Sequence, residues 1–244
     1  MLAMKTYECE RVVFLGDYFD CNPNLGEEGA SAANTIQRLN QLYYELGDKA
    51  IWLFGNHDLH YLAVWRPRNY SVPKTNWFAC SGYSRKTARE FNLSATKDWV
   101  ESWDLACVVN DVTLSHAGFH PRLLKPRKTP FKSVVEWCHK WHDDFRTFGQ
   151  TPNHWLNDVH HCRGGFSESG SPIWLDWNHE FVPIEGMPQI VGHSQTLEQK
   201  WNSMCIDDKR RSFGILGVDK SLIVVRNGEE ILKTNLNENG TGKK

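Results

Sequence analysis

The chain contains none of the segments that mark membrane or secreted proteins. Its 244 residues include no apolar run of about 18 residues, so we expect no membrane-spanning helix. The first ten residues have no apolar core of the signal-peptide type. The sequence also lacks internal repeats and low-complexity linkers, which argues against a solenoid and against separate domains.

Cysteines are few, and their pattern argues against a disulfide framework. The seven cysteines are odd in number and scattered, and no two are spaced as CxxC. Small secreted proteins instead carry an even number of cysteines. Reduced thiols fit the pattern better, so we expect a cytoplasmic protein.

A strong charge imbalance is absent as well. The formal net charge of −1 leaves no broad basic surface for nucleic acid, so any contact with a polyanion would be local. With 40% hydrophobic and 12% aromatic residues, the chain can bury a sizeable core. We therefore expect one domain over residues 1–244, with cap or loop-rich insertions at 61–104 and 121–188 and a frayed tail after 235.

Alternating strand and helix signals open the chain. Residues 11–15 form a short β-branched and aromatic run that ends at Gly16, as a buried strand would. Residues 31–46 repeat apolar side chains at helical spacing, and residues 50–54 predict a second buried strand that also stops at a glycine. This order predicts a strand–helix–strand unit and an α/β fold.

Later segments predict further strands and one more helix. Residues 105–114 predict a strand pair that turns at 110–111, and residues 213–226 predict a closing hairpin. Residues 133–145 predict a helix, and residues 189–191 lead as a short apolar run into a polar motif.

Polar motifs follow four of the apolar runs. They are Gly-Asp-Tyr-Phe-Asp at 16–20, Gly-Asn-His-Asp at 55–58, Ser-His-Ala-Gly at 115–118 and Gly-His at 192–193. Open α/β folds place ligands at the carboxyl ends of strands, so two carboxylates, an amide and three imidazoles could converge there. Oxygen and nitrogen donors of this kind suit Mn²⁺, Fe or Zn²⁺ better than Ca²⁺.

The order and the neighbours of these motifs resemble the calcineurin-like metallophosphoesterases, in particular the bacterial and phage type of the phosphoprotein phosphatase branch. The signature of that family runs DxHG, GDxxD, GNH(D/E), a lone His and GH, and the last four are present here in that order. The stretch 163–177, with Arg-Gly-Gly and Ile-Trp-Leu-Asp-Trp, resembles the loop before the last histidine of the family. The resemblance implies a four-layer α/β/β/α sandwich, here without its first strand.

The resemblance implies a metal-dependent phosphatase with two divalent ions, Mn²⁺ first and Fe or Zn²⁺ as alternatives. Asp17 would bridge the two ions. The second ion would take its other ligands from Asn56, His116 and His193. A water acidified by the ions would attack phosphorus in line, and the ions would stabilise the charge on the attacking and leaving oxygens.

Three further residues take roles by the same resemblance. His57 would protonate the leaving alkoxide, and Asp20 would hold the His57 imidazole protonated and correctly aimed. Arg163 would clamp the phosphate by a bidentate contact. The substrate would be a phosphoprotein, a nucleotide or a dinucleoside polyphosphate, and the sequence does not choose among them.

The sequence departs from the family at its start. Residues 1–15 contain no DxHG motif and no histidine, so the first ion keeps only Asp17 from its usual ligands, and Cys21 stands where phosphoprotein phosphatases carry an arginine. Either the chain is a fragment of a longer protein, which we favour because the missing segment includes a central strand, or it is a short variant with one good metal site. For the chain as it stands we expect weak or no phosphatase activity. The alternative function is a binding protein that keeps the fold and one ion.

Each motif also has an ordinary structural explanation. Asp17 and Asp20 could be turn residues, and Asn56 could cap a helix. His116 could be a satisfied core histidine, and Arg163 could pair with a surface carboxylate. Only their joint occurrence in one order favours a metallophosphatase site.

A second stretch rich in histidine and cysteine lies outside these motifs. It comprises Cys138, His139 and His142 at helical spacing, followed by His160, His161 and Cys162. A structural zinc site is one interpretation of this stretch. The paired spacing of a zinc finger is absent, which favours placement in surface loops.

Overall fold

The computed structural model describes residues 2–19, 32–62, 82–124, 136, 155–209 and 212–237. Asp20, the predicted partner of His57, lies outside these residues. So do Cys138, His139 and His142, almost all of the helix predicted at 133–145, and all but two residues of the predicted tail. A search of the described residues finds no helix with the length and hydropathy needed to cross a membrane.

Short helices and strands alternate along the described part of the chain. The helices are α1 (Leu2–Thr6), α2 (Ala32–Leu46), α3 (Asn56–Leu62), α4 (Arg85–Ser94) and α5 (Lys97–Glu101), and the 3₁₀ turns are η2 (Gly47–Lys49), η4 (Trp155–Asn157) and η5 (His161–Arg163). The strands are β1 (Val12–Phe14), β2 (Ala50–Leu53), β3 (Trp103–Asp104), β4 (Ala106–Val109), β5 (Val112–Ser115), β6 (Gln189–Val191), β7 (Leu197–Lys200), β8 (Ser203–Ile206), β9 (Ser212–Leu216), β10 (Ser221–Arg226) and β11 (Glu229–Asn235).

The strand–helix–strand unit predicted at the start of the chain is confirmed. Strands β1 and β2 pair in parallel, with helix α2 as the crossover, and β3 joins them in a three-stranded parallel sheet. The polar motifs after β1 and β2 therefore lie at the same edge of this sheet.

A second sheet carries the other two motifs. Its order is β4-β5-β6-β8-β7, with β5, β6 and β8 parallel to one another. The predicted turn between β4 and β5 is confirmed, and both of its residues, Asn110 and Asp111, have positive φ angles of 51° and 57°. A tight hairpin turn of this kind requires positive φ, which Asn and Asp tolerate.

The third sheet has the order β11-β10-β9, and its apolar side chains pack with those of the second sheet. The β9–β10 hairpin was predicted, whereas β11 was not. Strands β7 and β8 were also missed, because β7 carries charged and polar side chains that give no clear alternation.

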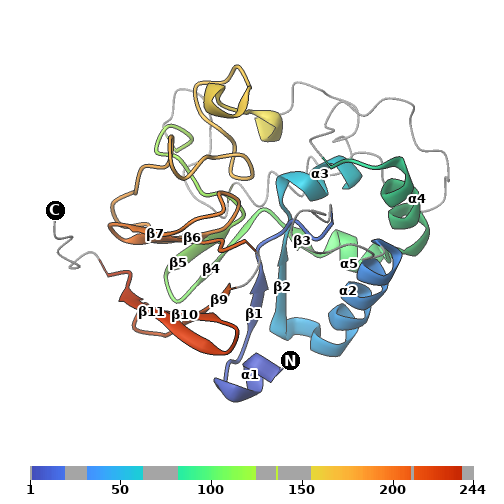
Figure 1. Cartoon of the computed structure of the whole chain (residues 1–244), viewed down its shortest axis with the longest axis horizontal. Helices are drawn as coiled ribbons and strands as arrows, with labels where there is room; N and C mark the ends of the chain where they lie inside the picture. The colour runs from blue at the N-terminus through green and yellow to red at the C-terminus, as the bar shows by residue number, and fades with distance from the viewer. Residues whose placement is uncertain are drawn as a thin grey trace.

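The first sheet lies between two hydrophobic cores, because successive side chains of its strands point to opposite faces. Phe14 of β1 and Trp52 of β2 face helices α2, α4 and α5, while Val13 and Ile51 face the second and third sheets. Figure 1 shows the three helices on one side of β1 and β2 and the second sheet on the other side. This alternation at a period of two residues produces the α/β/β layers of the predicted sandwich.

Among the described residues, the segment 155–188 covers the outer face of the second sheet. Trp177 and Phe181 stack on each other and pack with Val191 of β6 and Cys205 of β8.

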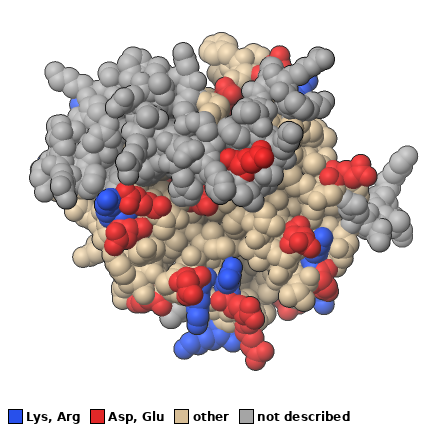
Figure 2. All heavy atoms as spheres, turned by 180° about the vertical axis from the view of Figure 1, so that it is seen from behind, with Lys and Arg blue, Asp and Glu red and all other residues tan. Residues whose placement is uncertain are grey.

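On the molecular face that Figure 2 shows, the acidic and basic side chains of the described residues are interspersed.

We expect the aromatic core beneath the helices to dominate stability. Trp52 is 1% exposed and stacks on Phe14 with ring centroids 4.2 Å apart. Trp52→Ala should lower the free energy of unfolding by about 3–5 kcal/mol, measured by urea denaturation, because it removes a large buried side chain. Leu93→Ala, at a side chain that is 55% exposed on α4, is the control and should change it by less than about 0.5 kcal/mol. Equal effects of the two substitutions would contradict this description of the core.

Candidate metal centre

Two glycines let the first two motifs approach closely. A Cβ atom on Gly16 would lie 2.4 Å from the backbone nitrogen of Gly55, and Gly16 has a φ of +93°, which favours glycine. A Cβ atom on Gly55 would lie 2.2 Å from a carboxylate oxygen of Asp17 and 2.7 Å from the ring of His116. The glycines are therefore required by the approach of backbone to backbone and of backbone to the polar side chains.

A buried carboxylate joins the two loops. Asp58 accepts hydrogen bonds from the backbone N–H groups of Asp17 (2.6 Å), Tyr18 (2.8 Å) and Gly55 (2.9 Å). The contact with Gly55 reaches back to the residue before α3, as the acidic residue of a capping box does. Burial and the charge of Asp17 raise the pKa of Asp58 to about 7, and the bonds from Gly55 and Tyr18 oppose that shift.

His116 follows β5 directly, and its tautomer can be deduced from its neighbours. Its Nδ1 atom lies 2.7 Å from the backbone carbonyl oxygen of Leu15, which can only accept, so Nδ1 carries the proton. Burial lowers the pKa of His116, but the charge of Asp17 and the hydrogen bonds to Asp17 and to Leu15 raise it above its usual value, so Nε2 can carry a proton that a bound metal ion would replace. That atom lies 3.1 Å from Oδ1 of Asn56, 3.1 Å from Nδ1 of His193 and 3.4 Å from a carboxylate oxygen of Asp17.

His193 lies just beyond β6 and completes the cluster. Burial and the charges of His116 and Arg163 hold the pKa of His193 well below its usual value, so its ring is neutral. Its Nε2 atom is buried and has no hydrogen-bond partner among the described residues. The neutral imidazole is the form that binds a metal ion.

Asp17 and His193 both have left-handed backbones, with φ of 57° and 70°. Residues other than glycine rarely adopt this backbone conformation, and those that do are concentrated at functional sites. Burial opposes ionisation of Asp17, but the charge of His116 and a hydrogen bond from it lower the pKa of the carboxyl well below its usual range. Asp17 is therefore an anion at neutral pH.

The donor set fits a divalent cation. The structure brings together Asp17, Asn56, His116 and His193, all four residues predicted from the motifs to bind the second ion, and ligand atoms of Asp17, His116 and His193 all lie within 4.8 Å of one another. Several of these atoms present lone pairs to one another, which is unfavourable unless a proton or a cation lies between them. The Leu15 carbonyl that fixes the His116 ring is the outer-shell partner common at metal-binding histidines.

His57 lies beside the cluster without being part of it. Its backbone N–H donates to a carboxylate oxygen of Asp17 at 3.0 Å, and the charge of His57 also lowers the pKa of that carboxyl. Residue 57 is the second residue of α3, which begins shortly after the end of β2.

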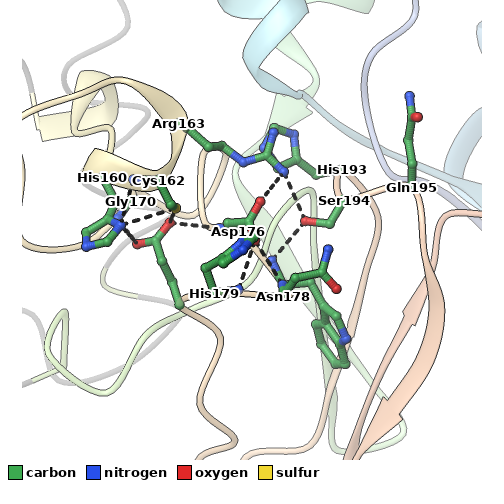
Figure 3. Close-up of polar contacts among 12 residues, drawn as sticks. His160, Cys162, Arg163, Gly170, Asp176, Asn178, His179, His193, Ser194 and Gln195 are labelled. Carbon is green, nitrogen blue, oxygen red and sulfur yellow. Dashed lines mark hydrogen bonds and ion pairs between the residues drawn. The ribbon is translucent and has the colours of Figure 1, made fainter.

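Arg163 lies at the end of η5 and reaches the same region. Its Nη2 atom is 2.7 Å from a carboxylate oxygen of Asp176 and 3.2 Å from the hydroxyl of Ser194 (Figure 3). Ser194 directly follows His193 and also accepts from the N–H of Trp177 at 2.9 Å. The Nε atom of Arg163 is buried and has no hydrogen-bond partner among the described residues. The contacts of Nη2 therefore hold the guanidinium group in place.

The motifs did not reveal which residues support this site. Asp58 belongs to the Gly-Asn-His-Asp motif, but the motif does not reveal its contacts with the first loop, since they depend on residues about forty positions away. Asp176 belongs to the Ile-Trp-Leu-Asp-Trp stretch, and Ser194 directly follows the Gly-His motif. Neither had a signal beyond its place beside a motif residue.

Comparison with known proteins identifies the family. A model of the calcineurin-like phosphoesterases matches residues 5–197, so the chain belongs to the calcineurin-like phosphoesterase family, and the resemblance seen in its motifs is confirmed. Members of this family bind divalent metal ions and hydrolyse phosphoesters, so its substrates are phosphorylated. No curated protein sequence matches the chain.

Solved structures of phosphatases are similar to this chain. A cold-active protein tyrosine phosphatase is 17% identical, with a TM-score of 0.55, and the match covers 93% of this chain and 68% of that one. A cold-active protein-tyrosine phosphatase of a psychrophilic Shewanella species is 13% identical, with a TM-score of 0.48, and the match covers 92% of this chain and 69% of that one. At 17% identity, the first of these matches shows the fold alone.

We expect Asp58 to be necessary for the shape of the site. Asp58→Asn would place an amide donor against backbone N–H donors, so it should lower the free energy of unfolding by about 1–3 kcal/mol and weaken Mn²⁺ binding. Urea denaturation and isothermal titration calorimetry measure the two effects. Asp111→Asn, at a side chain 89% exposed, is the matched control and should change neither. Wild-type Mn²⁺ affinity in Asp58→Asn would show that the three N–H contacts do not shape the site.

Proposed function

We propose that this chain is a metal-dependent phosphoester hydrolase whose ion is held by Asp17, Asn56, His116 and His193. The observation that carries the proposal is the convergence of these four side chains at the ends of β1, β2, β5 and β6. The anchored guanidinium of Arg163 beside His193 is the second support, because phosphate groups need a cationic partner.

We propose Mn²⁺ as the bound ion, with Fe or Zn²⁺ as alternatives. Carboxylate, amide and imidazole donors without a thiolate suit these ions. Asp17 has two carboxylate oxygens, so it is placed to bridge to a second ion in a dinuclear form. Among the described residues, however, Asp17 belongs to a single group of three potential ligands. We therefore propose one firmly held ion and a weaker second one.

The residues of the chain divide the chemistry among them. A divalent ion, when bound, supplies Lewis acidity that acidifies water and polarises the phosphoryl oxygens. Arg163 would bind two phosphoryl oxygens and orient the group, with Asp176 holding the guanidinium plane. His57 would donate its proton to the leaving alkoxide oxygen, and Asp20 would keep the imidazole protonated.

The substrate class stays open within phosphorylated compounds. The similar structures carry the name of protein tyrosine phosphatases, which supports a phosphoprotein as the first substrate to test. Nucleotides and dinucleoside polyphosphates are the other two candidates. The substrate would reach the site beside the segment 155–188, which carries Arg163.

A binding protein with one ion is the second candidate function. It is supported by the single group of potential ligands that includes Asp17 among the described residues. Such a protein would keep the ion at the four residues and bind phosphate through Arg163 without turnover.

Metal-dependent turnover separates the two functions. We expect slow hydrolysis of an aryl phosphate with added Mn²⁺, abolished by a chelator and by Asp17→Asn, because Asp17 is the only anion of the ligand set. A chain that binds Mn²⁺ at this site but releases no phosphate would support the binding protein. A chain that neither binds Mn²⁺ nor turns over would contradict both functions.

The roles of two histidines can be distinguished by metal content. His57→Asn should lower kcat by about 100-fold or more while the bound Mn²⁺ is unchanged, because general acid catalysis contributes about 10²–10⁴-fold. His193→Asn should instead lose the ion, as measured by elemental analysis after gel filtration. Loss of the ion in His57→Asn would mean that His57 is a ligand and that the proposed role is wrong.

A further inference from the structure

A second group of ligand atoms lies outside the candidate metal centre, on the segment that carries Arg163. The Nδ1 atom of His160 is 3.2 Å from the sulfur of Cys162, and that sulfur is 3.6 Å from a carboxylate oxygen of Glu180. The His160 nitrogen is 4.0 Å from the other carboxylate oxygen. Figure 3 shows the side chains of His160 and Cys162 next to each other.

The spacing of these atoms fits a tetrahedral ion. Zn²⁺ binds sulfur, nitrogen and oxygen at about 2.0–2.3 Å, which places ligand atoms about 3.3–3.6 Å from one another. Two of the three observed separations lie within about 0.1 Å of that range, and the third exceeds it by about 0.4 Å. The 3.6 Å and 4.0 Å distances end at different carboxylate oxygens of Glu180, so the three side chains would move closer together as they bind an ion.

The buried carboxylate of Glu180 is an independent argument for a cation-binding site. Its side chain is only 3% exposed, and among the described residues its one ion-pair partner within 4.0 Å is the His160 ring. A buried carboxylate without a cation is costly. Its two oxygens each accept one backbone N–H, from Gly170 at 2.7 Å and from Asp176 at 2.9 Å, so the carboxylate is already oriented and still has free lone pairs.

The tautomer of His160 suits a ligand as well. Its Nδ1 atom accepts a hydrogen bond from the backbone N–H of Cys162 at 3.2 Å, so this nitrogen carries a lone pair. An ion would replace that weak contact. The thiol of Cys162 would release its proton to solvent as the sulfur binds the ion.

We propose that His160, Cys162 and Glu180 form a second, thiolate-containing site for Zn²⁺ or a similar transition-metal ion. Cys162 is exposed, so water can take the fourth position. A neighbouring group consists of Cys162, Asp176 and His179. It is the weaker choice, because the Asp176 carboxylate already binds Arg163 and His179.

The proposed ion would fix the position of Arg163. Cys162 precedes Arg163 in the chain, and Glu180 binds the N–H of Asp176, whose carboxylate holds the guanidinium group. The site is thus structural, and its existence does not depend on the function proposed above.

Co²⁺ is a probe that separates the two sites. A cysteine thiolate bound to Co²⁺ gives an intense charge-transfer absorption in the near ultraviolet, whereas the Asp17 centre contains no sulfur. Titration of the reduced, metal-free full chain with Co²⁺ should produce this band with a stoichiometry of one per chain. The band should persist in Asp17→Asn, which loses the other ion.

Substitutions of the three residues complete the test. Cys162→Ser should abolish the band, whereas Cys9→Ser, at a partly exposed thiol in a different segment, should keep it. Glu180→Gln and His160→Asn should raise the apparent Kd for Co²⁺ at least about tenfold. Absence of the band in the wild-type chain, or its survival in Cys162→Ser, would overturn the proposal. Circular dichroism of each variant shows that it is folded.

Discussion

The candidate centre depends on one buried carboxylate. Asp58 binds three backbone N–H groups, two from the loop after β1 and one from the loop after β2. Backbone groups at the ends of strands need partners, and here a single side chain satisfies three of them. The same contacts hold Asp17 in its left-handed conformation and press Gly16 against Gly55, so the ligands on two different strands are brought to one point.

The sheets explain why the remaining ligands meet there. Strands β5 and β6 are parallel neighbours, so His116 and His193, just beyond their ends, lie side by side. The carbonyl of Leu15, at the end of β1, then accepts from the His116 ring and connects the two sheets. Hydrophobic packing between the sheets sets this distance, and the polar contacts at the edge use the alignment that the packing provides.

Much of this could be predicted from the sequence, because it depends on local signals. Buried strands that end in glycine and a helix with regular apolar spacing gave the first unit, and the motif order gave the family. The supports of the site were harder to predict, since Asp58, Asp176 and Ser194 act through contacts with distant backbone groups. The pairing of Cys162 with Glu180 likewise depends on a loop whose path no periodicity encodes.

A continuous chain of polar contacts connects the Asp17 centre with the cluster of His160, Cys162 and Glu180. Arg163 contacts Ser194 beside His193 on one side and Asp176 on the other, and Asp176 is in turn bound by Glu180. The carboxylates of Glu180 and Asp176 are both held by backbone N–H groups. A displacement of Glu180 would therefore also displace the guanidinium group of Arg163. Arg163 lies at the end of a single 3₁₀ turn, and its proposed role in phosphate binding requires a guanidinium group that is held in place. Such a chain of contacts supplies the rigidity that the local backbone lacks, and an ion at Cys162 would anchor its far end.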